Sequence, residues 1–372
     1  MGRDKSFDIA KGICIIMVVM GHTWPHYRNW IYLFHMPYFL MVSGYFFSFN
    51  PHKVSELKEY WIKKVKALYA PYILTNGLFI IFTDFLIKIN IYTNNVAFLE
   101  HTNEWPYQQV LCSFLTIKST VIKLLKTLLL LGETQLGSPL WFLAELFLAV
   151  LVHSTAVFVL RKRKYFNRRC YESVALVLTF VLAIVISQYN FDVRVIVKRF
   201  PAAYFCFLLG VMLQNNRDKL KYMGTLCLIS FSLLYLIQDY QIVEISAGQI
   251  GNPLLFVMAA LAGWFMLISL SKYLQGIHKL PYTVVAIFEY IGKHTLSILC
   301  LHFLSFKLIT WLYISYKEMP HYMLASFPIV FDASPVWKGM YVTAVVLIPM
   351  LIAVLWNSLK KMITTSFNKK VL

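Results

Sequence analysis

The sequence predicts an all-α integral membrane protein: a bundle of about ten transmembrane helices with both termini in the cytoplasm. Hydrophobic residues make up 59% of the 372-residue chain and charged residues only 14%, and the mean hydropathy is +0.63. A soluble protein of this composition would carry more apolar surface than it could bury. In addition, apolar runs near the length that crosses a bilayer recur along the whole chain.

Ten runs are expected to span the membrane. They lie at about residues 9–27, 31–49, 68–88, 139–160, 173–190, 200–214, 223–239, 253–271, 294–314 and 339–358. The sixth run is short, and the apolar segment 281–292 is read as a helix on the cytoplasmic surface or as a further span. Segment 104–132 sets lysines among Leu, Ile and Val, which predicts one or two interfacial helices in an outer loop. We expect one transmembrane domain over residues 1–372.

The distribution of basic residues sets the expected orientation. Lys and Arg concentrate in segments that an even number of spans puts on the side of the N-terminus, at 53–66, 161–169, 217–221, 272–293 and from 360 onward. By the positive-inside rule this side is cytoplasmic. The same topology, together with contact with anionic membrane lipids, explains the net charge of +18. No nucleic-acid partner is expected, because no soluble face interleaves basic and aromatic residues.

Two histidines mark the predicted outer boundary. His22 ends the first run and His35 begins the second, thirteen residues later, so a short loop allows one site to hold both. Imidazole is poorly solvated in hydrocarbon and titrates near neutrality, which favours a chemical role over simple packing. The plainer alternative is that backbone groups or water satisfy both rings.

Asp8 belongs to the opposite end of the first run. It precedes His22 by fourteen residues, which is about 21 Å along a continuous helix. Asp8 is therefore too far away to orient His22. A desolvated carboxylate needs a cation, and we expect Arg3, Lys11 or the cluster around Lys63 and Lys66 to supply it.

An ordered series of short motifs extends over nearly the whole chain. It consists of Arg3, Asp8, Lys11-Gly12, Gly21-His22, Phe34-His35-Met36-Pro37, Ser43-Gly44-Tyr45, Ala70-Pro71-Tyr72, Leu140-Trp141-Phe142-Leu143, Phe207-Leu208-Leu209-Gly210, Gly251-Asn252-Pro253, Gly263, Gly292-Lys293 and His302. Through this series the chain resembles membrane acyltransferase family 3, on the branch of sugar O-acetyltransferases related to fucose 4-O-acetylases.

The resemblance implies a single acyltransferase-3 domain in a bacterial-type inner (cytoplasmic) membrane. It implies transfer of an acyl group, usually acetyl, from cytoplasmic acetyl-CoA to a hydroxyl of a cell-surface or lipid-linked glycan. Acetyl-CoA is then a substrate, and we expect no metal and no permanently bound cofactor. His22 is predicted to be the general base, which takes the proton of the attacking hydroxyl. His35 is predicted to orient it, position the acceptor or polarise the carbonyl, and an acyl-histidine intermediate is the alternative route.

The resemblance also suggests which residues bind the acyl donor. These are Arg3, Asp8, Lys63 and Lys66. Family members commonly have arginines in the cluster that here contains lysines, and lysine binds phosphate without the bidentate fork of arginine. The alternative is that Lys63 and Lys66 only follow the positive-inside rule.

Four further residues are predicted to line the acceptor site or its cavity: Trp141, Glu145, Arg199 and His302. His302 lies about eight residues into the ninth run, so it is expected to face the bundle interior, with a structural role as the alternative. Arg199, with Arg194 and Lys198, lies on the outer side against the positive-inside trend. This position suits contact with an anionic glycan or a lipid-linked pyrophosphate.

Two other classes of function stay open on the sequence. In a transporter or flippase, His22, His35, His302 and Lys307 would form a substrate or proton pathway. The chain could also be a non-catalytic partner in a polysaccharide export system. Neither reading uses the ordered motif series.

Overall fold

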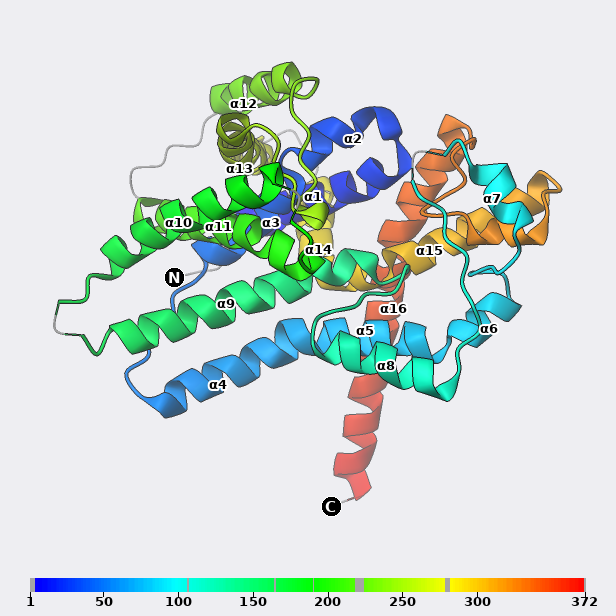
Figure 1. Ribbon diagram of the computed structural model, residues 1–372, viewed down its shortest axis with the longest axis horizontal. Helices are drawn as coiled ribbons and strands as arrows, with labels where there is room; N and C mark the ends of the chain where they lie inside the picture. The colour runs from blue at the N-terminus through cyan, green and yellow to red at the C-terminus, as the bar shows by residue number, and fades with distance from the viewer. Residues whose placement is uncertain are drawn as a thin grey trace. The chain divides into compact units, whose positions relative to one another are not determined.

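The computed structural model describes residues 4–105, 107–163, 165–189, 191–217, 224–277 and 282–370. The described residues are mostly helical and contain no β-strand, only an isolated antiparallel bridge between Glu244 and Gln249 (Figure 1). The predicted all-α class is therefore confirmed.

Seven helices of the described chain are long and apolar enough to cross a membrane. They are α1 (Lys5–Thr23), α9 (Trp141–Leu160, continued backwards by the turn Ser138–Leu140), α10 (Arg168–Gln188), α11 (Val195–Asn215), α13 (Pro253–Gly276), α15 (Thr295–Tyr316) and the first part of α16 (Pro335–Lys370). The chain is a multi-pass membrane protein.

The other helices are shorter. They are α2 (Pro25–Tyr32), α3 (His35–Tyr45), α4 (Val54–Lys64), α5 (Ala70–Ile81), α6 (Thr83–Lys88), α7 (Ala97–Thr102), α8 (Ile117–Leu128), α12 (Gly224–Ile237) and α14 (Tyr282–Lys293), with a π-helical turn at Val65–Tyr69 and 3-10 turns at Ile245–Ala247 and His321–Ala325.

Three expected spans are shorter than the sequence suggested. Run 31–49 contains the 11-residue α3, run 68–88 contains the 12-residue α5 followed by α6, and run 223–239 contains the 14-residue α12. About 20 residues cross a bilayer, so length alone identifies seven spans, and the count of ten and the cytoplasmic termini stay predictions. The described part of segment 281–292 lies in α14 (Tyr282–Lys293), which at 12 residues is also too short to span alone. Within segment 104–132 one helix forms, α8.

The chain divides into two compact units. Unit 1 comprises Met1–Pro25, Phe82–Leu115 and Tyr282–Leu372, and unit 2 comprises His26–Ile81 and Thr116–Pro281. Unit 1 thus contains α1, α14, α15 and α16, and unit 2 contains α3, α9, α10, α11 and α13.

Glycines set the closest helix crossing in unit 1. Helix α1 packs along α14, where a methyl group on Gly12 would overlap the carbonyl oxygen of Phe288. In the same way, a methyl group on Gly292 would overlap the carbonyl oxygen of Asp8. The two backbones touch here because neither residue has a side chain.

In unit 2, α3 and α11 also pack closely through glycines. A methyl group on Gly44 would overlap the carbonyl oxygen of Phe207, and one on Gly210 would overlap that of Met41. These two glycines of the motif series therefore have a packing explanation. They fix the position of α3, the helix that begins at His35.

Candidate functional site

In unit 1, two of the predicted site residues meet. His22 lies in the last turn of α1 and His302 in α15, and their imidazole rings stack with centroids 5.7 Å apart and 26° between the ring planes. Phe303 presents its ring to His22 at 5.0 Å, nearly at right angles. His302 is buried, whereas His22 is half-buried, so a reacting group can approach the pair from the side of His22.

Hydrogen bonds fix which nitrogen of His302 carries its proton. The Nδ1 of His302 lies 2.9 Å from the carbonyl oxygen of Leu299 and 3.2 Å from that of Ile298. A carbonyl only accepts, so Nδ1 is the donor and Nε2 of the neutral ring carries the lone pair. Nε2 has no hydrogen-bond partner among the described residues. The ring is therefore held in one tautomer beside His22.

Lys307 follows His302 on the same helix and is also buried. Its ammonium group donates to the carbonyl oxygens of Ser326 at 2.7 Å and Leu324 at 3.1 Å. These bonds tie α15 to the turn His321–Ala325 and the residue that follows it. The geometry explains Lys307 as an anchor for this segment.

The first turns of α1 place Asp8 far from the histidine pair along the helix, as predicted. Asp8 is buried and pairs with Lys11 at 2.8 Å, and Lys11 is one of the cations that the sequence offered. Arg3 lies outside the described residues. Nearby in unit 1, Glu289 pairs with Lys5 at 3.6 Å and bonds Lys293 at 2.5 Å. The bond from Lys293 holds the pKa of the Glu289 carboxyl below its ordinary value.

His35 begins α3 in unit 2 and is buried. Its Nδ1 donates to the carbonyl oxygen of Ile31 at 2.9 Å, and Tyr32 packs against the ring at 4.8 Å. The ring is thus held in the same tautomer as His302, with the lone pair on Nε2.

The two predicted donor-binding lysines lie at an irregular stretch of helix. Lys63 is in the last turn of α4 and pairs with Glu59 at 2.9 Å on an exposed surface. Lys66 lies in the π-helical turn Val65–Tyr69 and is exposed. A π-helical turn is uncommon and occurs often at functional sites. Here the turn places the exposed Lys66 shortly before the first residue of α5.

A second cluster in unit 2 centres on Arg199 of α11. Its Nη1 donates to the Glu133 carboxylate at 2.8 Å, and its Nε donates to the Ser246 carbonyl at 2.5 Å. The guanidinium carbon lies 5.3 Å from the ring centroid of Trp141, which is cation–π distance. Arg199 and Trp141 are thus brought together as two members of the predicted acceptor set.

Glu145 lies one helical turn after Trp141 on α9. Its side chain is 0% exposed, and neither carboxylate oxygen has a hydrogen-bond partner in the described part of the chain. Arg199 and Glu133 are the charged groups that act on it. Burying a carboxylate without hydrogen bonds costs free energy, so packing alone does not explain Glu145.

The loop that carries Glu133 is fastened to α5. The Tyr72 hydroxyl donates to the Gly132 carbonyl at 2.8 Å, and the backbone N–H of Thr134 donates to the Asn76 side chain at 2.9 Å. Burial raises the pKa of the Glu133 carboxyl, and the charge of Arg199 opposes that rise. The sequence analysis did not single out Glu133, because no motif surrounds it.

A cavity of about 600 Å³ opens between this loop, α8 and the start of α11. Its lining consists of Lys126, Leu129, Leu130, Leu131, Gly132, Glu133, Arg194, Val195, Ile196 and Arg199. The ion pair of Glu133 with Arg199 therefore forms part of its wall. Figure 1 shows α8 beside α5, as their packing requires.

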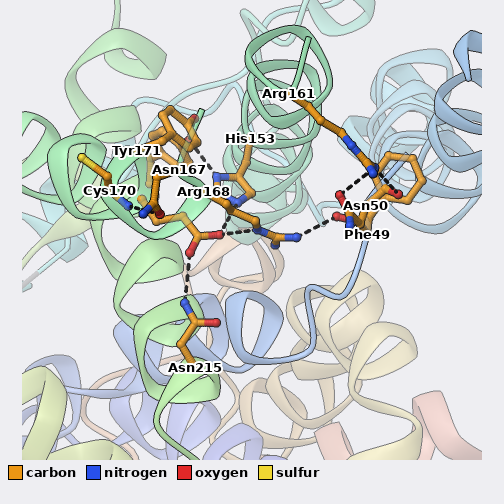
Figure 2. Close-up of polar contacts among 11 residues, drawn as sticks. Phe49, Asn50, His153, Arg161, Asn167, Arg168, Cys170, Tyr171 and Asn215 are labelled. Atoms are coloured by element: carbon orange, nitrogen blue, oxygen red, sulfur yellow. Dashed lines mark hydrogen bonds and ion pairs between the residues drawn. The ribbon is translucent and has the colours of Figure 1, made fainter. Parts of the chain in front are cut away.

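Unit 2 also contains a polar network that no sequence motif indicated. Figure 2 shows His153, Arg168 and Asn215 around one carboxylate, which their contacts identify as that of Glu172. Arg168 and Asn215 donate to Glu172 at 2.7 and 3.0 Å, and His153 lies 3.6 Å away. The Nδ1 of His153 lies 3.1 Å from the Tyr204 hydroxyl. The available signal was His153 inside the run 139–160, with Arg168 and Glu172 just before the run 173–190.

The structure thus defines an all-helical, multi-pass membrane protein with a stacked histidine pair in one unit and a basic cavity in the other. The chain belongs to the acyltransferase family whose model is described as "Acyltransferase domain", and the match covers residues 4–357. This confirms the family that the motif series indicated.

Curated relatives match a much smaller part of the chain. The nodulation protein NolL of Mesorhizobium japonicum is 43% identical over 60 residues, which cover 12% of this chain and 16% of that protein. The nodulation protein NolL of Sinorhizobium fredii is 48% identical over 59 residues, with the same coverage. The chain therefore spans about a sixth of the length of these relatives. No solved structure matches the chain.

Proposed function

We propose that the chain is a membrane O-acyltransferase that moves an acetyl group from cytoplasmic acetyl-CoA to a hydroxyl of a cell-surface or lipid-linked glycan. The observation that carries the proposal is the stacked pair of His22 and His302. Membership of the acyltransferase family supports the class of reaction. A bacterial-type inner membrane is the proposed location, because there one face meets acetyl-CoA and the other meets envelope glycans.

In the proposed reaction His22 is the general base. A sugar hydroxyl is a weak nucleophile, and removing its proton during attack contributes about two to four orders of magnitude in rate. The hydroxyl oxygen bonds to the thioester carbonyl carbon, the carbon–sulfur bond breaks, and the proton that His22 took passes to the leaving CoA thiolate. Atoms and charge balance without a metal or a redox partner.

His302 acts through His22 in this scheme, as a positioning residue. Its Nδ1–H is held by the carbonyls of Leu299 and Ile298, so the ring cannot rotate without losing these bonds. A fixed neutral ring stacked on His22 orients the base and faces the imidazolium that forms on it. His35 is proposed to bind the acceptor or to polarise the carbonyl.

Donor and acceptor residues complete the proposal. Lys63 and Lys66 supply exposed positive charge for the phosphates of CoA, and Arg3 and Asp8 are proposed to act with them. For the acceptor we propose Trp141, Glu145 and Arg199, because Arg199 contacts Trp141 beside an open cavity.

The test uses the full chain, purified and placed in lipid nanodiscs with acetyl-CoA labelled in the acetyl group. Transfer of label to an added glycan acceptor is measured for the wild type, His22→Ala and His302→Ala. We expect His22→Ala to lower kcat by about 100-fold or more. We expect His302→Ala to lower kcat while leaving KM for acetyl-CoA nearly unchanged. His321→Ala, an exposed histidine of the same unit, is the matched control.

Two results would overturn the proposal. If His22→Ala transfers the acetyl group as fast as His321→Ala does, His22 is not the general base. If no acetyl group moves, but reconstituted vesicles accumulate a saccharide in response to a proton gradient, the chain is a transporter instead.

A further inference from the structure

The cavity beside Glu133 carries more positive charge than its own acid can neutralise. Three cations line it, Lys126, Arg194 and Arg199, against one carboxylate, Glu133. Arg199 is paired with that carboxylate. Among the described residues, no ion pair forms at Lys126 or Arg194. Lys126 and Arg194 therefore give the lining two positive charges that no carboxylate of the lining neutralises.

These charges lie on elements that hold them in place. Lys126 is in the last turn of α8, Arg194 immediately precedes α11, and Arg199 is in the second turn of α11. The first turn of α11, Val195 and Ile196, also lines the cavity, and its backbone N–H groups favour an anion. Of the Arg199 donors, Nη2 bonds to no described residue, so it can reach a ligand as well.

The rest of the lining is apolar. The apolar residues of the lining are Leu129, Leu130, Leu131, Val195 and Ile196. Leu129 and Val195 are 66% and 47% exposed, and Val195 directly follows the basic Arg194. A small hydrophilic anion would leave this apolar surface uncovered, whereas an amphiphile covers it.

The cavity is also preformed. Besides the bond from Tyr72 and the bond that Asn76 accepts, the Thr127 hydroxyl donates to the Gly132 carbonyl at 3.2 Å, so the loop 129–137 is tied to α5 and α8. The Tyr69 hydroxyl donates to the Leu128 carbonyl at 2.7 Å and ties α8 to the π-helical turn. A ligand need not order it, which lowers the entropic cost of binding.

We propose that this cavity binds an amphiphile with a doubly charged phosphate monoester or pyrophosphate head and an aliphatic tail. Two uncompensated cations match a dianion, and the leucine side matches the tail. A bilayer phosphodiester has one negative charge and matches less well. If the proposed function holds, this ligand is the lipid carrier of the glycan acceptor, and that assignment alone rests on the proposed function.

Binding is tested on the full chain in nanodiscs made only of phosphatidylcholine. The probe is dodecyl phosphate, titrated while the intrinsic tryptophan fluorescence is recorded. Dodecanol has the tail alone, inorganic phosphate has the head alone, and phosphatidylglycerol has a bilayer phosphodiester head. We expect saturable binding of dodecyl phosphate, at least about tenfold tighter than the other three probes.

The variants Lys126→Gln and Arg194→Gln should each weaken dodecyl phosphate binding by about tenfold, because each removes a charged partner of the phosphate. The matched control is Lys123→Gln, an exposed lysine on the same helix that does not line the cavity. Its affinity should equal that of the wild type.

Three results would overturn the inference: equal weakening by Lys123→Gln, equal binding of inorganic phosphate, or equal binding of phosphatidylglycerol. The last would make the cavity a bilayer-lipid site. Acetyl transfer distinguishes the two proposals. If dodecyl phosphate binds specifically but no acetyl group is transferred, only the proposed function is wrong. If the acetyl group is transferred but dodecyl phosphate does not bind specifically, only this inference is wrong.

Discussion

Replacing Arg199 by Met removes the guanidinium and keeps the aliphatic stem, so it tests the contacts of the guanidinium, the strongest of which is the ion pair with Glu133. The side chains are 13% and 19% exposed, and the charged atoms lie 2.8 Å apart. An exposed pair contributes about 0–1 kcal/mol, whereas loss of one partner from a fully buried pair costs about 3–5 kcal/mol. For this partly buried pair we expect Arg199→Met to lower the free energy of unfolding by about 2–3 kcal/mol at neutral pH.

The loss of stability in Arg199→Met should be larger at high pH than at low pH. Burial already raises the pKa of Glu133, and Arg199 opposes this, so in Arg199→Met the folded-state pKa lies higher still. Between the ordinary glutamate pKa and this raised value the folded state binds more protons than the unfolded state. Stability of the variant therefore falls as pH rises through that range, and the defect shrinks below it, where Glu133 is protonated in both states.

The assay is denaturant unfolding in bicelles near pH 5 and pH 8, for Arg199→Met, Glu133→Gln and the double variant. Because the double variant has no unpaired charge, it should recover part of the loss, with a coupling energy of about 1–3 kcal/mol. The reasoning is refuted if the two substitutions are additive, or if Arg199→Met is equally destabilised at both pH values.

Three further predictions concern packing and buried charge. Gly210→Ala should lower the free energy of unfolding by about 3 kcal/mol, because its methyl group would overlap the Met41 carbonyl. Gly339→Ala, in α16 with open space around it, is the control and should raise that free energy by about 0.5–1 kcal/mol, with both variants measured by thermal unfolding. Glu145→Gln should leave the melting temperature unchanged or raise it, because the carboxylate that it replaces has no hydrogen bond among the described residues. A lower melting temperature would contradict this. Glu172→Ala should cost about 3 kcal/mol, because it leaves the buried His153 and the half-buried Arg168 and Asn215 without their acceptor, and a loss near zero would show that the network contributes no stability.

The sequence predicted those features of the fold that hydropathy determines. The runs 139–160 and 253–271 correspond closely to α9 and α13, because each is long, apolar and bounded by turn residues. Run 68–88 does not form one helix: α5 ends at Ile81 and α6 begins at Thr83. A window average of hydropathy does not resolve such a break, because a single residue, Phe82, separates the two helices.

Of the candidate residues that contact one another, His22, His302 and Trp141 belong to the motif series, whereas Arg199 was expected from its basic charge on the outer side. His22 and His302 were both expected at the site, but the sequence does not specify that their rings stack, because neighbours on different helices depend on how the helices cross. Glu133 had no signal at all. Its place beside Arg199 depends on a loop whose hydrogen bonds to Tyr72 and Asn76 join segments about sixty residues apart.

Mass spectrometry of surface glycans tests the central claim most directly. Cells that lack this chain are complemented with the wild type, His22→Ala or His321→Ala at matched membrane levels. The account predicts that the wild type and His321→Ala restore an added acetyl mass on a glycan and that His22→Ala does not. Restoration of the same mass by His22→Ala, or no acetyl mass with the wild type, would contradict it.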